Sequence, residues 1–180
     1  MENTNDVAVV YHSAFGHNQR IAQTIYEGAI TSGASAVIMS VDEVDWEILD
    51  QSRLIVFGCP TYLGSVTHQF KKFMDDSGMR WVERTWQGKW AAGFTVSGGL
   101  SGDKLSVLQQ MCLYALQQGM NWTGLPKPST GKSDTDFNRL SSFMGLMCQA
   151  NDEPADVTPP VGDIDTARWF GGHLAEIAKR

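Results

Sequence analysis

The chain has 180 residues, of which 42% are hydrophobic and 19% charged, and its formal net charge is −6. These values are typical of one globular domain, here residues 1–180, whose core needs neither disulfides nor metal. A net negative charge argues against nucleic-acid binding, which usually requires a basic surface. No apolar run approaches the roughly 20 residues of a membrane span, and the polar start, residues 1–6, is unlike a signal peptide.

The cysteines indicate a reducing environment. Cys59, Cys112 and Cys148 are odd in number and widely spaced inside apolar runs. This arrangement matches neither a disulfide framework nor a metal site. We therefore expect buried, reduced thiols, no metal ion and a cytoplasmic location.

Strand-like and helix-like segments alternate along the chain. Five segments have the apolar character of strands: residues 7–12, 35–41, 53–58, 90–96, and a fifth that begins at 121–125 and could resume at 143–148. Four segments have apolar residues at helical spacing: residues 21–29, 66–76, 104–118 and 167–178. Residues 42–51 predict a short helix or turn, and residues 78–88 a polar-aromatic connection. Residues 127–139 predict a polar surface insertion.

This alternation predicts an α/β fold with a doubly wound, five-stranded parallel sheet. The common strand order for such a sheet is 2-1-3-4-5, with its switch point between strands 1 and 3. The loops that leave strands 1, 3 and 4 then lie around one crevice. All three loops are rich in small, hydroxyl-bearing or turn-forming residues, which favours a binding site there.

The first loop comprises Ser13, Ala14, Phe15, Gly16, His17 and Asn18. It precedes a helix, whose first amide groups lack partners and carry roughly half a positive charge. Ser13 and Asn18 add side-chain donors, and Gly16 lets the backbone approach a ligand closely. Because the loop contains no lysine or arginine, we predict a phosphate held by backbone and hydroxyl donors. The alternative is a strand-to-helix turn that binds nothing, as in most proteins of this class.

The other two loops extend this hypothesis. The second offers an aromatic face, a hydroxyl group and backbone donors suited to a flat polar ring: Pro60, Thr61, Tyr62, Leu63 and Gly64. The third, residues 97–102, is open and hydroxyl-bearing, and suits a polyol chain or the far edge of the ring. A phosphate, a polyol and a flat heterocycle together describe FMN.

Three stretches give the chain a resemblance to a known family. Residues 11–17, Tyr-His-Ser-Ala-Phe-Gly-His, are similar to a Ser-x-[Tyr/Phe]-Gly-His phosphate loop. Residues 58–64 precede a helix that contains Gln69, Phe70, Lys72 and Phe73, and residues 78–89 include Trp81. The chain therefore resembles the flavodoxin-like superfamily. It looks closest to the NAD(P)H:quinone oxidoreductases of the tryptophan-repressor-binding-protein type.

The resemblance implies roles for individual positions. Residues 13–18 would bind the FMN phosphate, and residues 60–64 would line the isoalloxazine ring. Four residues would close over its other side: Ser97, Gly98, Gly99 and Gly102. Trp81 matches a family tryptophan beside the flavin, sometimes across a subunit boundary, and is the candidate catalytic residue.

Two features differ from the family pattern. The family has histidine before the Gly-Met that follows the fourth helix, whereas this chain has Gln117 and Gln118. The insertion at residues 127–139 is also unlike the family. Both leave the acceptor pocket and the oligomeric state, homodimer or homotetramer, open.

Two functions fit this pattern. The favoured one is an enzyme that transfers hydride from NAD(P)H through FMN to a small quinone-type acceptor, where the cofactor carries the chemistry. The alternative is a flavodoxin-type one-electron carrier without NAD(P)H activity of its own. Carriers are steered to basic partners by a strongly acidic surface, and a net charge of −6 is modest for that role. The Gly-His loop and Trp81 also favour the enzyme.

Several conspicuous residues have simpler interpretations. Five tryptophans are expected to serve packing: Trp46, Trp86, Trp90, Trp122 and Trp169. His68 and His173 are expected to be solvated, and Cys59 to be a buried structural thiol. For His12, at the rim of the expected site, a structural and a functional role are equally supported.

Overall fold

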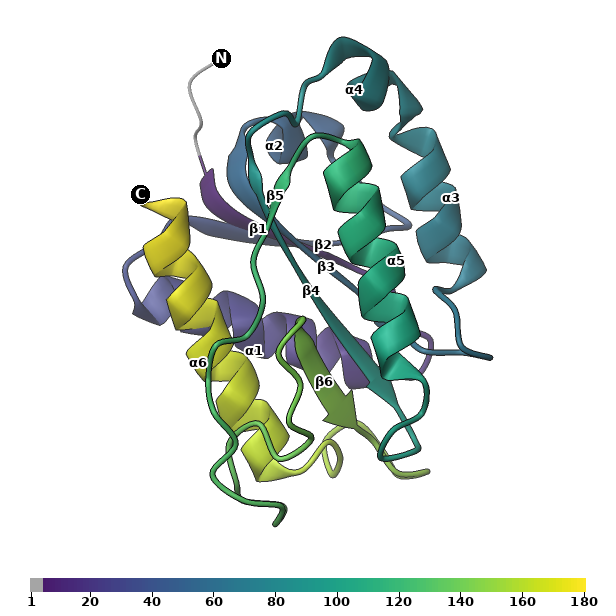
Figure 1. Cartoon of the computed structure of the whole chain (residues 1–180), viewed down its shortest axis with the longest axis vertical. Coiled ribbons are helices and arrows are strands. Elements are labelled where there is room, and N and C mark those ends of the chain that lie inside the picture. Colours follow the sequence, from purple (N-terminus) through teal and green to yellow (C-terminus); the bar gives the residue numbers. More distant parts are fainter. Residues whose placement is uncertain (1–4) are drawn as a thin grey trace.

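A parallel sheet forms the centre of the computed structural model, which describes residues 5–180 (Figure 1). Its strands are β1 Asn5–Tyr11, β2 Ala36–Ser40, β3 Ser52–Pro60, β4 Trp90–Ser97, β5 Asn121–Trp122 and β6 Leu146–Gln149. The order is β2-β1-β3-β4-β5, and β6 also pairs with β4. The predicted α/β class and the strand order 2-1-3-4-5 are confirmed. Residues 1–4, part of the start that we expect not to be a signal peptide, lie outside the described residues.

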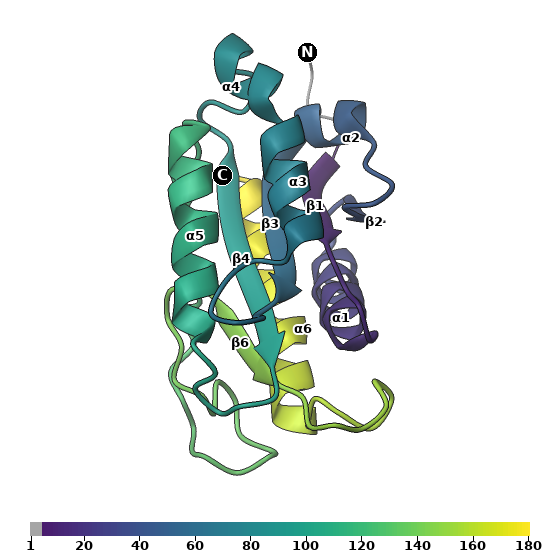
Figure 2. The ribbon, with the colours of Figure 1, turned by 90° about the vertical axis from the view of Figure 1, so that its right-hand side faces the viewer.

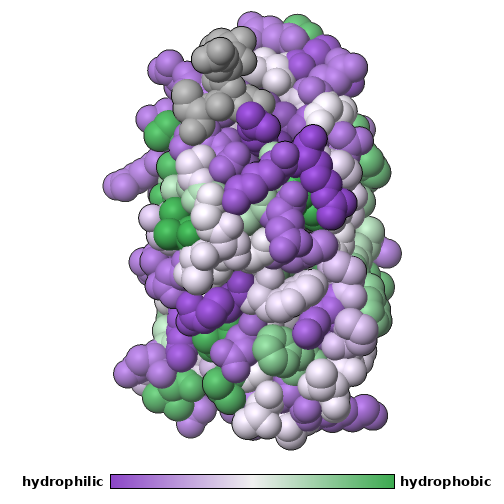
Figure 3. Space-filling view, turned by 90° about the vertical axis from the view of Figure 1, so that its left-hand side faces the viewer, coloured by the Kyte–Doolittle hydropathy of each residue, from purple (hydrophilic) through white to green (hydrophobic). Residues whose placement is uncertain are grey.

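Helices cover both faces of the sheet. On one face lie α1, His17–Thr31, and α6, Val161–Ala178; on the other lie α3, His68–Asp76, and α5, Lys104–Gln117 (Figures 1 and 2). The side on which α6 lies in Figure 1 is mainly hydrophilic, with small separate hydrophobic patches (Figure 3). Most apolar residues of α1 and α6 are buried against the sheet, as their spacing predicts.

Strand β1 illustrates why the strands are continuously apolar. Val7 and Val9 pack under α1 and α6, whereas Ala8 and Val10 pack on the side of α3 and α5. All four side chains are fully buried. Since successive side chains point to opposite faces, a strand that is covered on both faces needs apolar residues at every position.

The fifth strand is interrupted, as the sequence suggests. Trp90 and Ala91 of β4 pair with β5, and the later residues of the same strand pair with β6. The residues between β5 and β6 leave the sheet and return. The two arms of this excursion are joined by a bond from Trp122 Nε1 to the Met144 carbonyl at 2.8 Å.

The insertion corrects one expectation. Residues 127–139 were expected to form a polar surface excursion, but Asn138 and Arg139 are buried. The Asn138 amide donates to Thr166 Oγ1 at 2.8 Å, and Arg139 pairs with Asp163 of α6. Tertiary polar contacts therefore fix the end of the insertion to the body of the protein.

Two short helices lie between the expected strands. The short helix or turn at residues 42–51 is the helix α2, Trp46–Asp50. The connection at residues 78–88 contains the helix α4, Gly78–Glu83, which we did not predict. A helix this short needs tertiary support. Arg80 supplies it, because its guanidinium binds the Asp50 carboxylate and lies 4.4 Å from the centre of the Trp46 ring.

The helices give no indication of a membrane span. Across residues 5–180, none combines the length and apolar character needed to cross a bilayer.

Candidate functional site

A cavity of about 510 Å³ opens where β1, β3 and β4 end. Nine of the predicted site residues line it: Ser13, Ala14, Phe15, His17, Asn18, Pro60, Tyr62, Ser97 and Gly98. The remaining lining residues are Val96, Ala150, Asn151, Asp152, Glu153 and Pro154. The structure thus brings parts of all three predicted loops to one cavity at the switch point of the sheet.

The first loop turns directly into α1. Gly16 precedes the helix with a φ of 88°, a left-handed conformation that favours glycine. A side chain here would also be crowded, since a Cβ atom on Gly16 would lie 3.1 Å from the Cβ of Ala155. The Gly16 amide donates to Ser13 Oγ at 3.1 Å, which folds the loop back on itself. The first amides of α1 are left facing outward.

A segment that we did not predict closes the cavity on one side. His17 Nε2 donates to the Glu153 carbonyl at 2.8 Å, and the Arg20 guanidinium donates to the Ala155 carbonyl at 2.5 Å. These bonds hold residues 150–155 against the first loop. The segment follows β6, whose carboxyl end lies at the same edge of the sheet. Its position after the last predicted strand is the feature of the sequence from which its place beside the cavity could have been predicted.

Hydrogen bonds within the second loop and to its neighbours fix its conformation, and its tip is exposed. Tyr62 and Ser65 exchange backbone hydrogen bonds of 3.2 and 3.1 Å, and Leu63 and Gly64 between them both have positive φ. Thr61 is buried and its hydroxyl lies 2.8 Å from that of Thr95, so it anchors the loop instead of lining the cavity. Leu63 is fully exposed at the tip. Pro60, predicted as loop, is the last residue of β3.

The third loop presents only its first part to the cavity. Ser97 and Gly98 line it, whereas Gly99 and Gly102 do not. Gly102 has a φ of 54° and packs closely on Ser97. A Cβ atom at position 102 would lie 2.1 Å from Ser97 Oγ, so a larger residue would clash there. The Lys104 ammonium donates to Ser97 Oγ at 2.7 Å and to the Gly99 carbonyl at 2.5 Å. Lys104 is a buried residue of the site region that we did not predict.

Two residues behind the loops have structural contacts. His12 Nδ1 lies 3.0 Å from the hydroxyl of Thr67, the residue that caps α3, and burial lowers the pKa of His12 while Asp42 opposes the shift. Cys59 is buried, and burial raises the pKa of its thiol to about 12. The prediction that Cys59 is buried is confirmed. All three cysteines are buried and unpaired with one another.

The packing predictions have a mixed outcome. Trp86 is fully buried, and Trp46 stacks on Phe73 with ring centres 5.2 Å apart. His68 is exposed, as expected. His173, expected to be solvated, is instead half-buried and stacks on Trp169 at 5.2 Å, and burial lowers its pKa.

Trp81 lies apart from the cavity. It is 52% exposed on α4, and borders a different depression together with Gln117 and Gln118. Within a single chain it cannot contact a ligand in the cavity between the three loops. A role beside the cofactor stays a prediction and requires a second copy of the chain.

The electrostatic character of the cavity is unusual for a phosphate site. Among the described residues that line it there is no lysine or arginine, while Asp152 and Glu153 contribute carboxylates. Anion binding would therefore rely on helix amides and hydroxyl groups. Within residues 5–180, no three side chains of histidine, cysteine or acidic residues lie together as a metal site requires.

One buried atom of the first loop supports a polar ligand. Asn18 is 2% exposed, and its side-chain oxygen has no hydrogen-bond partner within the part of the chain that the structure describes. A buried acceptor without a partner is costly, and a ligand hydroxyl would relieve that cost. The set of donors and acceptors, with the cradle at Gly16, fits a phosphate joined to a polyhydroxy chain.

These features define a flavodoxin-like α/β protein with a cavity at the switch point of the sheet. The family model described as flavodoxin matches residues 9–110, more than half of the chain. The chain belongs to the flavodoxin family.

The individual relatives carry two kinds of name. Flavodoxin FldP of Pseudomonas aeruginosa (strain UCBPP-PA14) is 37% identical over 181 residues, covering 96% of each chain. An NAD(P)H dehydrogenase (quinone) of Paracoccus denitrificans is 30% identical, covering 96% of this chain and 93% of its own. The crystal structure of the flavodoxin, WrbA-like protein from Agrobacterium tumefaciens matches with a TM-score of 0.78 and 35% identity over 98% of both chains. The similar proteins are thus named both flavodoxin and NAD(P)H dehydrogenase (quinone).

Proposed function

We propose that the chain binds FMN in the cavity between the three loops and acts as a flavodoxin-type electron carrier. The observation that carries the cofactor assignment is the convergence of the first, second and third loops on one cavity of about 510 Å³, with the amino end of α1 at its edge. FMN would supply the redox chemistry, accepting and releasing electrons at its ring system.

The residues of the chain would bind and orient this cofactor. Ser13, Asn18 and the first amides of α1 would hold the phosphate and the adjoining hydroxyl groups. Pro60 and Tyr62 would border the ring, and Ser97 and Gly98 would lie on its other side. The predicted residues outside the cavity lining would instead shape the loops: Gly16, Thr61, Leu63, Gly64, Gly99 and Gly102.

The rim of the cavity favours a carrier over an enzyme. Phe15, which is 75% exposed, lines the cavity, as do the exposed carboxylates Asp152 and Glu153; Leu63 and Leu100, in the second and third loops, are 106% and 63% exposed. Exposed apolar side chains on the three loops, together with exposed carboxylates, suit transient docking to a basic protein. Two of the three observations that favoured the enzyme are weakened, because Trp81 lies elsewhere and His17 binds the backbone of Glu153; the modest net charge of −6 still favours it.

Hydride transfer from NAD(P)H to a quinone is the second candidate. It is supported by the relatives named NAD(P)H dehydrogenase (quinone), and by a depression of about 840 Å³ beside the third loop. Leu100, Leu105 and Phe143 border this depression and could receive an apolar acceptor. The balanced reaction would be NAD(P)H, a proton and a quinone giving NAD(P)⁺ and a hydroquinone.

One set of measurements separates these functions. FMN is titrated into the apoprotein by fluorescence, and the holoprotein is then mixed with NADH or NADPH and benzoquinone without any partner protein. The carrier proposal expects tight FMN binding and a rate of nicotinamide oxidation close to that of free FMN. Rapid oxidation by the holoprotein alone would establish the reductase instead. Absence of FMN binding would overturn both.

A further inference from the structure

Lys104 places a buried positive charge directly behind the cavity wall. It is the first residue of α5 and is 0% exposed, which is rare for a lysine. Its ammonium donates to Ser97 Oγ and to the Gly99 carbonyl. Ser97 lines the cavity, so one side chain separates the charge from the ligand space.

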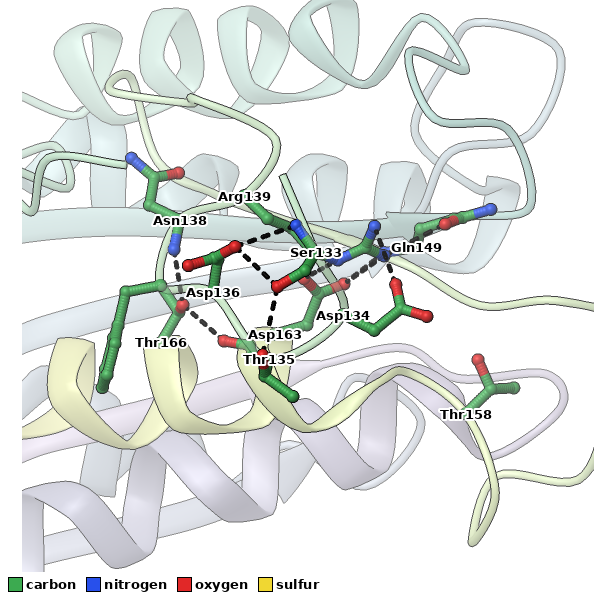
Figure 4. A network of polar contacts seen from close by, with 12 residues as sticks. Ser133, Asp134, Thr135, Asp136, Asn138, Arg139, Gln149, Thr158, Asp163 and Thr166 are labelled. Atoms are coloured by element: carbon green, nitrogen blue, oxygen red, sulfur yellow. Dashed lines mark hydrogen bonds and ion pairs between the residues drawn. The ribbon is translucent and has the colours of Figure 1, made fainter. Parts of the chain in front are cut away.

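The buried carboxylate that interacts electrostatically with Lys104, Asp163, is engaged elsewhere. Asp163 is 3% exposed; its two oxygens accept from the Arg139 guanidinium at 2.9 and 3.4 Å, and one of them also accepts from the Gln149 amide at 2.8 Å (Figure 4). No ion pair found within residues 5–180 includes Lys104. Asp134, at 3.5 Å from Arg139, is exposed and screened by water. This buried cluster contains two positive charges, on Lys104 and Arg139, and one negative charge, on Asp163. Its net charge is therefore +1.

The same network continues to the cavity wall. Gln149 receives a bond from Arg139 at 3.0 Å, and its side-chain amide donates to the Gly98 carbonyl at 3.0 Å. Ser97 and Gly98 are therefore both held from behind by groups of this network. A charge in such a water-poor setting acts more strongly than it would at the surface.

The ammonium is mostly protonated at neutral pH. Burial lowers the pKa of Lys104 to about 8, and the Asp163 carboxylate opposes this shift. Cys148 itself remains a neutral thiol, because burial raises its pKa well above the ordinary value.

We propose that Lys104 is a positioning residue that holds Ser97 and Gly99 and makes the cavity bind reduced FMN more tightly relative to oxidised FMN. This inference rests on the proposed function, since it requires FMN in the cavity. Reduction adds negative charge to the cofactor, and an unneutralised cation behind the wall favours that form. The reduction potential of the bound cofactor is raised accordingly.

The test compares Lys104→Gln with Lys89→Gln. Lys89 is a matched control because its half-buried ammonium also donates two bonds, to the Asp50 and Ser52 carbonyls, but at the other end of β4. Dissociation constants for oxidised FMN and for dithionite-reduced FMN are measured by anaerobic calorimetry. In Lys104→Gln we expect binding of reduced FMN to weaken about tenfold more than that of oxidised FMN. For a two-electron couple this lowers the midpoint potential by about 30 mV.

The conservative variant and the control complete the test. Lys104→Arg should keep the preference for reduced FMN, and Lys89→Gln should leave it unchanged. Equal weakening of both forms in Lys104→Gln would overturn the inference and leave a purely structural lysine. Failure of the parent protein to bind FMN would instead refute the proposed function.

The unmodified protein provides a second measurement that does not depend on the folding of any variant. The preference for reduced FMN, corrected for free FMN, should decline above pH 8 as Lys104 loses its charge. The facing groups are Cys148 on β6, Asp163 on α6 and Arg139 of the insertion. A preference that stays constant to pH 10 would contradict the inference.

Discussion

The two ends of β4 bury similar polar groups for different purposes. At the amino end, Lys89 binds the Asp50 and Ser52 carbonyls, and the Asp50 carboxylate accepts from Arg80 and from Trp86 Nε1 at 2.7 Å. These donors and acceptors satisfy one another and border no part of the cavity. At the carboxyl end, Lys104 binds a loop whose first residue lines the cavity. Lysines that bind backbone carbonyls in the same way, one half-buried and one buried, can thus support either the fold or a site, depending on what their acceptors line.

The largest expected effect tests how the carboxyl end is built. Arg139→Met should lower the free energy of unfolding by about 4 kcal/mol at pH 7, because Asp163 is left buried and unpaired. Burial raises the pKa of Asp163 in the folded protein above the ordinary value of 3.8. The folded state therefore binds more protons than the unfolded state between these two pKa values, and the free energy of unfolding falls as the pH rises through this range. Arg139 opposes this shift, so its loss should raise the pKa of Asp163 further and extend the decline in stability to higher pH. Chemical denaturation should therefore show a greater loss at pH 7 than at pH 5.

The double variant Arg139→Met/Asp163→Asn is the control for this prediction. It removes the titrating group, so its loss of stability should be nearly the same at both pH values. A single variant with a loss independent of pH would show that Asp163 is not the group responsible.

The amino end should respond in stability but not in ligand binding. Asp50→Ala leaves Arg80 and Trp86 without their acceptor and should cost about 3 kcal/mol of unfolding free energy. Affinity for FMN should stay within twofold of the parent, as measured by fluorescence titration of the folded protein. A large change in FMN affinity would remove the contrast between the two ends of β4.

The first loop should show the opposite response. Gly16→Val should weaken FMN binding at least a hundredfold, about 2.8 kcal/mol, since valine disfavours a φ of 88° and would crowd Ala155. Gly78→Ala is a suitable control, because φ at Gly78 is not positive and no atom lies within 4 Å of the Cβ position. Equal FMN affinity in the two variants would exclude the first loop as the phosphate site.

The smallest expected effect concerns the acidic wall of the cavity. Replacing Asp152 and Glu153 together by Asn and Gln should tighten FMN binding by about threefold at low salt, because both exposed carboxylates repel a phosphate. The effect should disappear at high ionic strength. Weaker binding in the double variant would show that these side chains hold the ligand directly.

The strands and the first loop were predictable because local pattern determines them. The continuous apolar residues of β1 and β3 require burial on both faces, and Gly16 marks the turn into α1. Parallel strands place their carboxyl ends at one edge, so the meeting of the three loops followed from their order. These features need no knowledge of distant contacts.

Other parts of the site depend on contacts that sequence does not specify. A lysine at the start of a helix is normally solvated, and only the fold of residues 97–103 around Lys104 buries it. Residues 150–155 join the site because His17 and Arg20 bind their backbone. The displacement of Trp81 from the cavity likewise follows from the short helix α4 and its contact with Asp50, which lies far away in sequence.

The interrupted fifth strand also bears on how the protein behaves at high concentration. A long unpaired edge of a sheet is a template on which other chains can assemble into aggregates. Here the edge beside β4 is divided into pieces of two and four residues, β5 and β6, and the chain between them leaves the sheet and returns. The interruption thereby shortens the edge strands, which disfavours edge-to-edge association on this side of the sheet.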